Sequence, residues 1–482
     1  MQPQTIGLAI LLLGALAALG MLIRASWGLT QRLFLPVSII AGFIGLILGP
    51  QVLGRLGGWL DVDWLRGLEE GGIFGAGVME VWGELPGLLI SVVFATLFLG
   101  SRIPSPQRAA KLLGPQLSLG VTFASGQYVV GLLLVVLLLV PLFDVTPMFG
   151  ALIEIGFEGG HGTAAGMAPV MTEMGFEDGG DLALAMATVG ILSGIIIGVL
   201  AVNWAARKGH ATELDADAQM PVWERRGLYA GLDKPSAGHE TARTAAIETL
   251  TLHVGFVALA VLIGQLLLSG LQALEGALWA ETIEIFAYVP LFPLAMLGGV
   301  VVQLVLDRFD TVGLIDRGMM ERIQGLSLDF LIISALATLS LTAIADNLAP
   351  FAILAIAGIL WNVFVLFVLA PRFIRSYWLE RGVGDFGQSM GVTATGLILM
   401  RMADPEARTP AYESFGYKQL IFEPFFGGGL ITAASIPLIV QLGPDPLLGI
   451  MAALLVVAVL TGLFYFGRNP AFDLKPLDSA GS

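Results

Sequence analysis

A twelve-residue stretch from Gly156 to Met167 places chemically active side chains inside strongly apolar sequence. It reads GFEGGHGTAAGM and contains a glutamate, a histidine, a threonine and five glycines. Ionisable groups are costly in hydrocarbon, and glycine is the poorest ordinary helix former. Irregular backbone is tolerated at membrane depth only where it is buried in protein or lines a water-filled cavity. The stretch is therefore a candidate binding site.

The glycines and polar residues of this stretch could bind a small anion. The substrate-binding candidates are Gly159, Gly160, His161, Gly162 and Thr163. Glycine lets the backbone approach a ligand closely, and the N-terminus of a half-helix presents unpaired N–H groups to an anion. The alternatives are close helix packing for the glycines and a structural hydrogen bond for His161.

Two glutamates precede or begin this stretch. Glu154 and Glu158 lie four residues apart, so on a helix they share one face. They could line an entry path for a cation, or the wall of a water-filled vestibule close to the outer surface. Glu158 is an ion-coupling candidate.

A second segment interrupted by glycine, 385–403, resembles the first in character. Ser389, Gly391, Thr393 and Thr395 are its substrate-binding candidates. Arg401 follows in ILMRMADP, where its guanidinium could pair with a substrate carboxylate or anchor the chain at the cytoplasmic surface.

Two further residues are candidates for coupling to an ion. Glu423 lies in IFEPFFGGG, within an apolar segment, and intramembrane carboxylates are functional candidates by default. It could bind Na⁺, take up a proton, or pair with an arginine near the cytoplasmic end. Asn347, near an apolar helix, is a further possible ion ligand.

The composition identifies the class of protein that holds these residues. The chain has 482 residues, 56% hydrophobic and 13% charged, and a mean hydropathy of +0.84. A soluble protein carries about a quarter charged residues. Cysteine is absent and the net charge is −14, which excludes thiolate chemistry and argues against a nucleic-acid partner. No HExxH, GxSxG or P-loop motif occurs, so we expect no enzyme, no cofactor and no metal beyond a transported ion.

Apolar runs long enough to span a bilayer as helices divide the chain. We predict spans at 5–23, 33–49, 85–101, 113–141 and 181–205, and then at 247–270, 285–305, 327–346, 349–371, 416–441 and 445–467. The predicted organisation is an N-terminal half (1–205), a cytoplasmic linker (206–246), a C-terminal half (247–441), and an extra transmembrane helix with a cytoplasmic tail (442–482). The fold class is thus an all-α polytopic membrane protein with about 11 spans.

The basic residues predict the orientation, because Lys and Arg accumulate on the cytoplasmic side. With the N-terminus outside, every Lys and Arg except Arg55 and Arg66 falls on the cytoplasmic side. This holds only if 146–175 and 385–403 each enter and leave on one face. Both are therefore predicted to be re-entrant hairpins, the first from outside and the second from inside.

The two halves are predicted to be inverted repeats. Each contains five spans with a re-entrant segment between the fourth and the fifth, and an odd number of spans reverses the orientation of the second half. FEGGHGTAAG (157–166) matches FGQSMGVTAT (386–395) at Phe157 and Phe386 and at Gly162 and Gly391, among others. Inverted repeats with broken helices at the midplane are typical of secondary transporters.

These motifs carry a family resemblance. GGHGTAAGM, the stretch GVTATGLILMRMADP and the five-plus-five layout resemble the bacterial sodium/glutamate symporter family over about residues 1–441. The second loop departs from a GGxG pattern, since it reads GQSMG. The resemblance implies sodium-coupled symport of L-glutamate, or a related acidic solute, by alternating access.

The expected setting is the bacterial cytoplasmic (inner) membrane, with the N-terminus outside and the C-terminus in the cytoplasm. The expected partners are the acidic substrate, sodium and membrane lipid, and a homodimer is left open. A proton-coupled dicarboxylate transporter of the same fold is the alternative function, with an ion channel as a second alternative.

Overall fold

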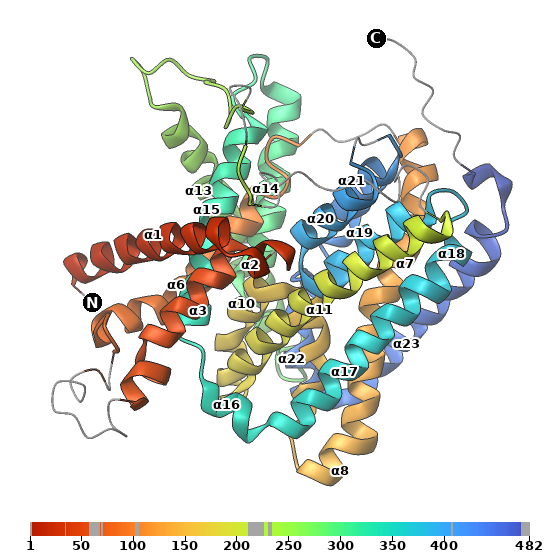
Figure 1. The fold of residues 1–482 in the computed structure, drawn as a ribbon, viewed down its shortest axis with the longest axis horizontal. Coiled ribbons are helices and arrows are strands. Elements are labelled where there is room, and N and C mark those ends of the chain that lie inside the picture. The colour runs from red at the N-terminus through yellow and green to blue at the C-terminus, as the bar shows by residue number, and fades with distance from the viewer. Residues whose placement is uncertain are drawn as a thin grey trace.

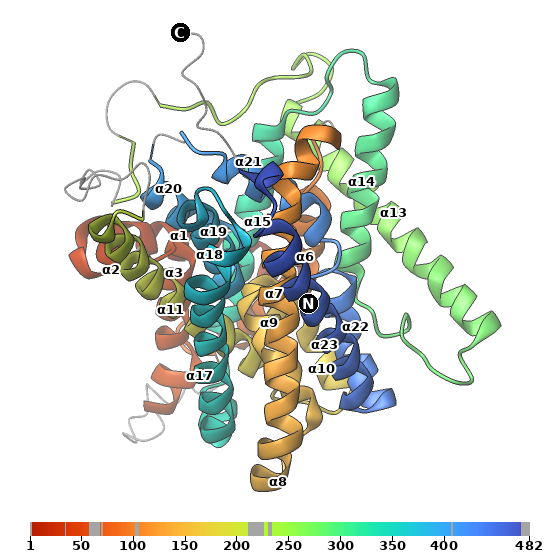
Figure 2. The same ribbon diagram turned by 90° about the vertical axis from the view of Figure 1, so that its right-hand side faces the viewer.

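A computed structural model shows a bundle of helices (Figures 1 and 2). It describes residues 2–33, 35–56, 68, 71–101, 106–210, 226–229, 234–405 and 408–473. Every regular element among these residues is a helix, which confirms the predicted all-α polytopic class. The predicted linker lies partly outside the described residues, at 211–225 and 230–233, and so does Arg66.

Nine described helical segments are long and apolar enough to cross a membrane. They contain α1 (Pro3–Ser26), α3 (Val37–Leu48) with η1 (Pro50–Gly54), α6 (Ala76–Thr96), α7 (Pro106–Leu134) with η2 (Val135–Leu139) and α8 (Val140–Phe143), α11 (Gly179–Lys208), α13 (Thr249–Leu278), α14 (Leu291–Phe309), α17 (Leu348–Phe364) with η4 (Val365–Leu369) and α18 (Ala370–Phe373), and α23 (Pro444–Leu460) with η5 (Thr461–Phe466).

The span predicted at 85–101 is shifted to Ala76–Thr96 (α6), and two others differ further from what the apolar runs indicated. The span predicted at 327–346 is α15 (Arg317–Ala337), which begins earlier because Asp316 caps its N-terminus by accepting a hydrogen bond from the Met319 N–H at 3.0 Å. Residues Leu341–Asp346 form a separate short helix, α16. The α15 helix carries several charged residues, yet it packs against α3 and α6.

The other difference lies in the span predicted at 416–441, which is broken. It consists of α21 (Ala411–Phe422) and α22 (Leu430–Leu442), separated by a non-helical segment, 423–429. Gly427 and Gly428 have φ of 68° and 111°, a conformation that non-glycine residues rarely adopt. Apolar length alone concealed this break.

The first interrupted segment folds as a helical hairpin. After η3 (Pro147–Ala151), α9 (Leu152–Phe157) leads through a tight turn into α10 (Gly160–Glu173). Gly160 at the turn has φ of 66°. The bounds agree closely with the predicted segment 146–175.

The second interrupted segment is also a hairpin, and it begins earlier than predicted. Helix α19 (Trp378–Gly391) is followed by α20 (Thr393–Ala403), with Val392 between them at φ 75° and ψ 160°. This region of backbone space is almost restricted to glycine, and a β-branched residue there stores about 1–3 kcal/mol of strain. The FEGGHGTAAG match does not align the two turns, because it pairs Val392 with Thr163 rather than with Gly160.

The tips of the two hairpins meet. A Cβ atom on Gly160 would lie 2.3 Å from Cγ1 of Val392, so the absence of a side chain at Gly160 permits the contact. In both views α10 lies in the half of the molecule that holds α8, whereas α19 and α20 lie in the half that holds α18 (Figures 1 and 2). The two hairpins therefore approach each other from opposite ends of the bundle.

A local feature recurs in helices α7 and α17. Each ends in a π-helical turn, η2 or η4, followed at once by a short helix containing Pro141 or Pro371. Proline has no N–H to donate, and the preceding turn takes the wider hydrogen-bond spacing instead. The recurrence adds to the similarity between the two halves.

The hairpin contact predicts the effect of an alanine at Gly160. We expect Gly160→Ala to lower the free energy of unfolding more than Gly175→Ala, measured by denaturant titration in detergent micelles. Gly175 has a similar φ, 87°, but open space around it, so its alanine variant bears only the backbone cost of about 1–2 kcal/mol. Gly160→Ala adds about 1–3 kcal/mol for the clash with Val392. Equal losses for the two variants would contradict the tip-to-tip contact.

Candidate functional site

A cavity of about 360 Å³ lies where the hairpin tips meet. Five parts of the chain contribute its wall: α6, α15, the two hairpin turns and the break between α21 and α22. The lining residues used below are Glu158, Gly159, Gly162, Arg317, Gln388, Val392, Thr393, Glu423 and Gly427. The cavity extends to Glu321 on α15, whose side chain is 46% exposed, so it reaches the protein surface there. A volume of this size suits a small organic ligand.

Glu158 is the most unusual group in the cavity wall. The residue is 2% exposed, and neither carboxylate oxygen makes a hydrogen bond of good geometry with a described residue, although the Ser389 hydroxyl is near enough to interact with it. It interacts electrostatically with Lys418, Glu154 and Asp385, two of which are also acidic. A buried carboxylate without hydrogen bonds is costly, so this geometry favours the binding of a cation beside Glu158.

Glu423 lies on the same wall and is held by two side chains. Its Oε1 accepts hydrogen bonds from Thr393 Oγ1 at 3.0 Å and from Gln419 Nε2 at 2.7 Å. Gln419 also donates to Thr393 at 2.8 Å. The second hairpin is thus tied to the end of α21, and the predicted neighbours Thr393 and Glu423 are brought together.

Glu154 holds the break between α21 and α22 in place. Its Oε1 accepts hydrogen bonds from the Gly427 N–H at 3.0 Å and from Thr432 Oγ1 at 2.8 Å, and its Oε2 accepts one from the Tyr128 hydroxyl at 2.7 Å. The residue is fully buried and is not among the residues lining the cavity. The vestibule alternative is therefore wrong for Glu154, whose carboxylate organises the backbone beside the cavity.

The remaining residues of the first hairpin have distinct positions. Gly159 and Gly162 line the cavity. Thr163 is buried and donates to the Gly427 carbonyl at 3.1 Å, so it also supports the helix break. His161 is buried against α11, where its Nε2 lies 3.0 Å from Thr188 Oγ1, which matches the structural alternative considered for it.

Buried polar contacts hold the turn of the second hairpin in place. The Ser389 carbonyl accepts hydrogen bonds from Gln127 Nε2 at 2.7 Å and Asn362 Nδ2 at 3.1 Å. The Ser389 hydroxyl is buried and makes no hydrogen bond of good geometry with a described residue. Gly391 packs against Ile191, which would lie 2.3 Å from a Cβ there, and Thr395 donates back to the Gly391 carbonyl at 2.7 Å.

Two candidates lie away from the cavity wall. Arg401 is exposed near the end of α20. Asn347 lies at the junction of α16 and α17 and donates to Asp178 Oδ2 at 3.1 Å and to the Ala343 carbonyl at 2.9 Å. Substrate binding by Arg401 and ion coupling by Asn347 stay predictions, and the positions of these residues do not support them.

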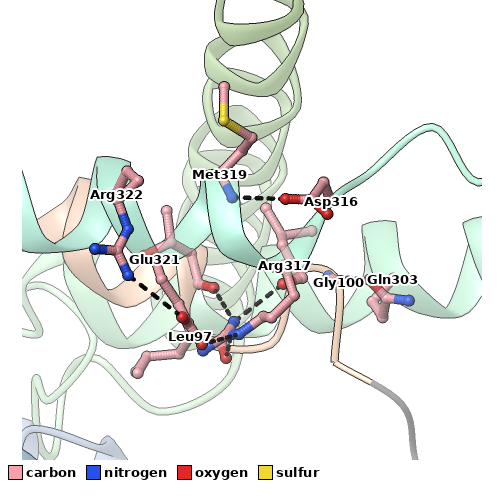
Figure 3. A network of polar contacts seen from close by, with 10 residues as sticks. Leu97, Gly100, Gln303, Asp316, Arg317, Met319, Glu321 and Arg322 are labelled. Carbon is pink, nitrogen blue, oxygen red and sulfur yellow. Dashed lines mark hydrogen bonds and ion pairs between the residues drawn. The ribbon is translucent and has the colours of Figure 1, made fainter. Parts of the chain in front are cut away.

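The arginine on the cavity wall is instead Arg317 (Figure 3). Its Nη1 donates to the carbonyls of Thr96, Leu97 and Leu99 at 2.9–3.0 Å, and its Nε donates to Glu321 at 3.2 Å. It therefore satisfies carbonyls left unpaired at the C-terminus of α6 and fixes α6 to α15. From the sequence alone, Arg317 falls in a cytoplasmic loop, ten residues before the span predicted at 327–346, with no role in the site.

A buried ionic group next to the cavity was also missed. Lys418 and Asp385 are both 0% exposed at the side chain, and Lys418 Nζ lies 3.6 Å from Asp385 Oδ1. Lys418 also donates to Gln388 Oε1 at 3.3 Å. The sequence did contain a signal, because Lys418 falls inside the predicted span 416–441. Since it lies near the cytoplasmic end of that span, the sequence predicts a position at the membrane surface for it.

The hydrogen bonds of Glu154 predict a stability effect. Glu154→Gln leaves one carbonyl oxygen and replaces the other with an amide donor, which faces the donors that the carboxylate accepted. We expect a loss of about 1–3 kcal/mol in the free energy of unfolding, measured by denaturant titration. Glu177→Gln, at an exposed turn, should stay within about 0.5 kcal/mol of the original. A loss of the same small size for both would remove Glu154 from this role.

Comparison with known proteins agrees with the geometry. The sodium/glutamate symporter family model matches residues 78–404, and no curated protein matches the chain. The matched region begins in α6 and ends just after α20, so it includes both hairpins and α15. It spans more than half of the 482 residues. The chain belongs to the sodium/glutamate symporter family.

Proposed function

We propose that this protein is a secondary active transporter that carries L-glutamate, or a related acidic solute, together with sodium by alternating access. The observation that carries the proposal is the buried carboxylate of Glu158, without a hydrogen bond of good geometry to a described residue, on the wall of a cavity between two hairpin tips. Sodium acts as the coupling ion, and the proposal requires no cofactor and no enzymatic step.

The charges around the cavity supply a physical reason for coupling. Glu158, Glu423 and Arg317 all line it, and the guanidinium of Arg317, which is hydrogen-bonded to α6 carbonyls and Glu321, also attracts the Glu423 carboxylate. An anionic substrate entering this cavity alone would still be repelled by the Glu158 carboxylate. A cation bound beside Glu158 offsets that repulsion, so substrate and cation favour each other's binding.

A second cavity supports access from two sides. It measures about 380 Å³ and is lined by residues of α6, α10, α13 and α14, among them Glu173 and Tyr288. Phe94 lines the first cavity and Phe292 the second, and their ring centroids lie 4.9 Å apart. Ile90 and Phe292 pack on Gly162 and Gly166 of α10. These apolar side chains form a partition between the two cavities.

Contacts near the ends of the helices support the proposed division of the chain into two sides of the membrane, and the distribution of Lys and Arg assigns the cytoplasmic side. Each contact joins residues assigned to one side of the membrane. On the outer side they are Asp181–Ser340, Asp178–Asn347 and Glu284–Gln441, and on the cytoplasmic side Leu99–Arg317, His239–Asp316 and Arg375–Asp473. With this orientation the first cavity opens to the cytoplasm. The proposed location is the bacterial inner membrane, with the N-terminus outside and the C-terminus inside.

The apolar exterior suits a lipid environment. Leu11, Leu266 and Leu360 are among the strongly exposed apolar side chains of α1, α13 and α17. Helices surrounded by lipid carry such residues on their outer faces. Whether two copies of the chain form a homodimer is left open, and we assign no surface to such a contact.

Proton coupling is the alternative that the same carboxylates allow. Glu158 or Glu423 could take up a proton in place of sodium, giving a proton-coupled dicarboxylate transporter of the same fold. An ion channel is less consistent with the partition of Ile90, Phe94 and Phe292, because a channel needs a continuous pore.

Uptake into liposomes tests the proposal. We expect purified protein to accumulate labelled L-glutamate under an inward sodium gradient, and Glu158→Gln to raise the half-saturating sodium concentration about tenfold or more, since losing about 1.4 kcal/mol of cation binding has that effect. Glu281→Gln, at an exposed loop, is the matched control and should behave as the original. Equal uptake with sodium replaced by potassium and a proton gradient would establish the alternative, and an unchanged sodium dependence in Glu158→Gln would remove Glu158 from the cation site.

A further inference from the structure

Lys418 is a cation enclosed entirely by protein. It lies on α21, and its side chain is 0% exposed. The ammonium lies 3.6 Å from Asp385 Oδ1, donates to Gln388 Oε1 at 3.3 Å, and sits 3.6 Å from the ring centroid of Phe422. A carboxylate oxygen, an amide oxygen and an aromatic face all favour a positive charge at this point. Oxygen ligands of this kind also bind hard metal cations.

The neighbouring helix leaves room for this lysine. A Cβ on Gly120 of α7 would lie 2.4 Å from Lys418 Cε and 3.1 Å from its Nζ. Any side chain at Gly120 would thus displace the end of the lysine. The ammonium occupies a space that three helices, α7, α19 and α21, shape around it.

The surrounding carboxylates depend on this charge. Neither oxygen of Asp385 makes a hydrogen bond of good geometry with a described residue, and its carboxylate interacts with Lys418, which is within ion-pair distance, with Gln116 and with Arg381. The nearby Arg381 directs its Nε to Gln116 Oε1 and its Nη2 to the Leu112 carbonyl, both at 2.9 Å. Glu158 also lies within electrostatic reach of Lys418. Without Lys418, Asp385 would lose the ammonium beside it and would retain only the more general attraction of Arg381 and the contact with Gln116.

We propose that the ammonium of Lys418 is a tethered cation that fills, beside Asp385, the place of an additional coupling ion. The inference rests on the sodium coupling proposed above and extends it. Glu158 lies on the cavity wall and can bind a cation that exchanges with solution. Asp385 does not line the cavity, and its cation is the covalently attached ammonium of Lys418. If Glu158 and Asp385 each needed a sodium ion, two ions would be required. Because Lys418 serves Asp385, one fewer sodium ion is exchanged.

Removal of the ammonium should create a new sodium requirement. Lys418→Met keeps an unbranched apolar chain of similar length but removes the ammonium from beside Asp385, and removing one partner of a buried ion pair is strongly destabilising. Sodium can then enter between Asp385 and Gln388 and restore stability. The double variant Asp385→Asn with Lys418→Met lacks both charges and has no such need.

Thermal unfolding in detergent tests this without relying on transport. Sodium chloride is replaced stepwise by choline chloride at constant ionic strength, in the absence of substrate. We expect Lys418→Met to melt lower than the original protein in choline and to regain stability with sodium. A new site at 100 times its Kd in sodium shifts the folding equilibrium about 100-fold. Lys111→Met, which removes an exposed lysine from α7, is the matched control and should respond to sodium as the original does.

The outcomes separate this inference from the proposed function. A larger sodium response in Lys418→Met than in the original, lost again in the double variant, supports a tethered cation. A response equal to that of the original overturns it, as does a Lys418→Met protein that sodium cannot rescue, or a double variant that keeps the larger response. The absence of any sodium response in the original protein would count against sodium coupling itself, whatever the difference between variants.

Discussion

The carboxylate of Glu158 is buried at the meeting point of two helix hairpins, and no described residue gives either oxygen a hydrogen bond of good geometry. A charge in this position is costly unless a cation accompanies it. The second carboxylate on the cavity wall, Glu423, is attracted by Arg317 and Lys418 and accepts hydrogen bonds from Thr393 and Gln419. Glu158 is therefore the carboxylate with the greater need of a cation. An acidic solute can bind there only together with positive charge, and coupling to a cation then follows from the electrostatics of the site.

The position of Glu158 depends on three interruptions of helical backbone that converge. Gly160 and Val392 form the hairpin turns, and the positive φ values of Gly427 and Gly428 open the third helix. Contacts across these interruptions hold them in register: Glu154 binds the Gly427 N–H, Thr163 binds its carbonyl, and Thr393 binds Glu423. The N–H and the carbonyl of Gly427, at the third break, are thus both met by side chains, as a low-dielectric environment requires.

Much of this arrangement could be predicted from the sequence, because ionisable residues and glycines inside apolar runs are rare enough to be informative. Glu158, Gly159, Gly162, Thr393 and Glu423 were recognised in this way and all line the cavity. Lys418, Asp385 and Arg317 were missed, since near the ends of spans a charged residue indicates a surface position, and only tertiary packing buries it. The break at 423–429 was hidden for a related reason: its flanking apolar residues make one continuous run, although Pro424 and the three glycines signalled it. The position of Arg401 shows the converse, a plausible anion partner that packing leaves exposed.

A cation bound beside Glu158 at the hairpin tips is the central feature of the proposed transport mechanism. Crystals of the protein soaked in thallium(I), a monovalent cation that scatters X-rays strongly, would locate it directly by anomalous diffraction. We predict a peak within coordination distance of the Glu158 carboxylate that weakens as sodium is added in competition. A peak at another carboxylate with none at Glu158, or a peak there that sodium does not displace, would contradict the account.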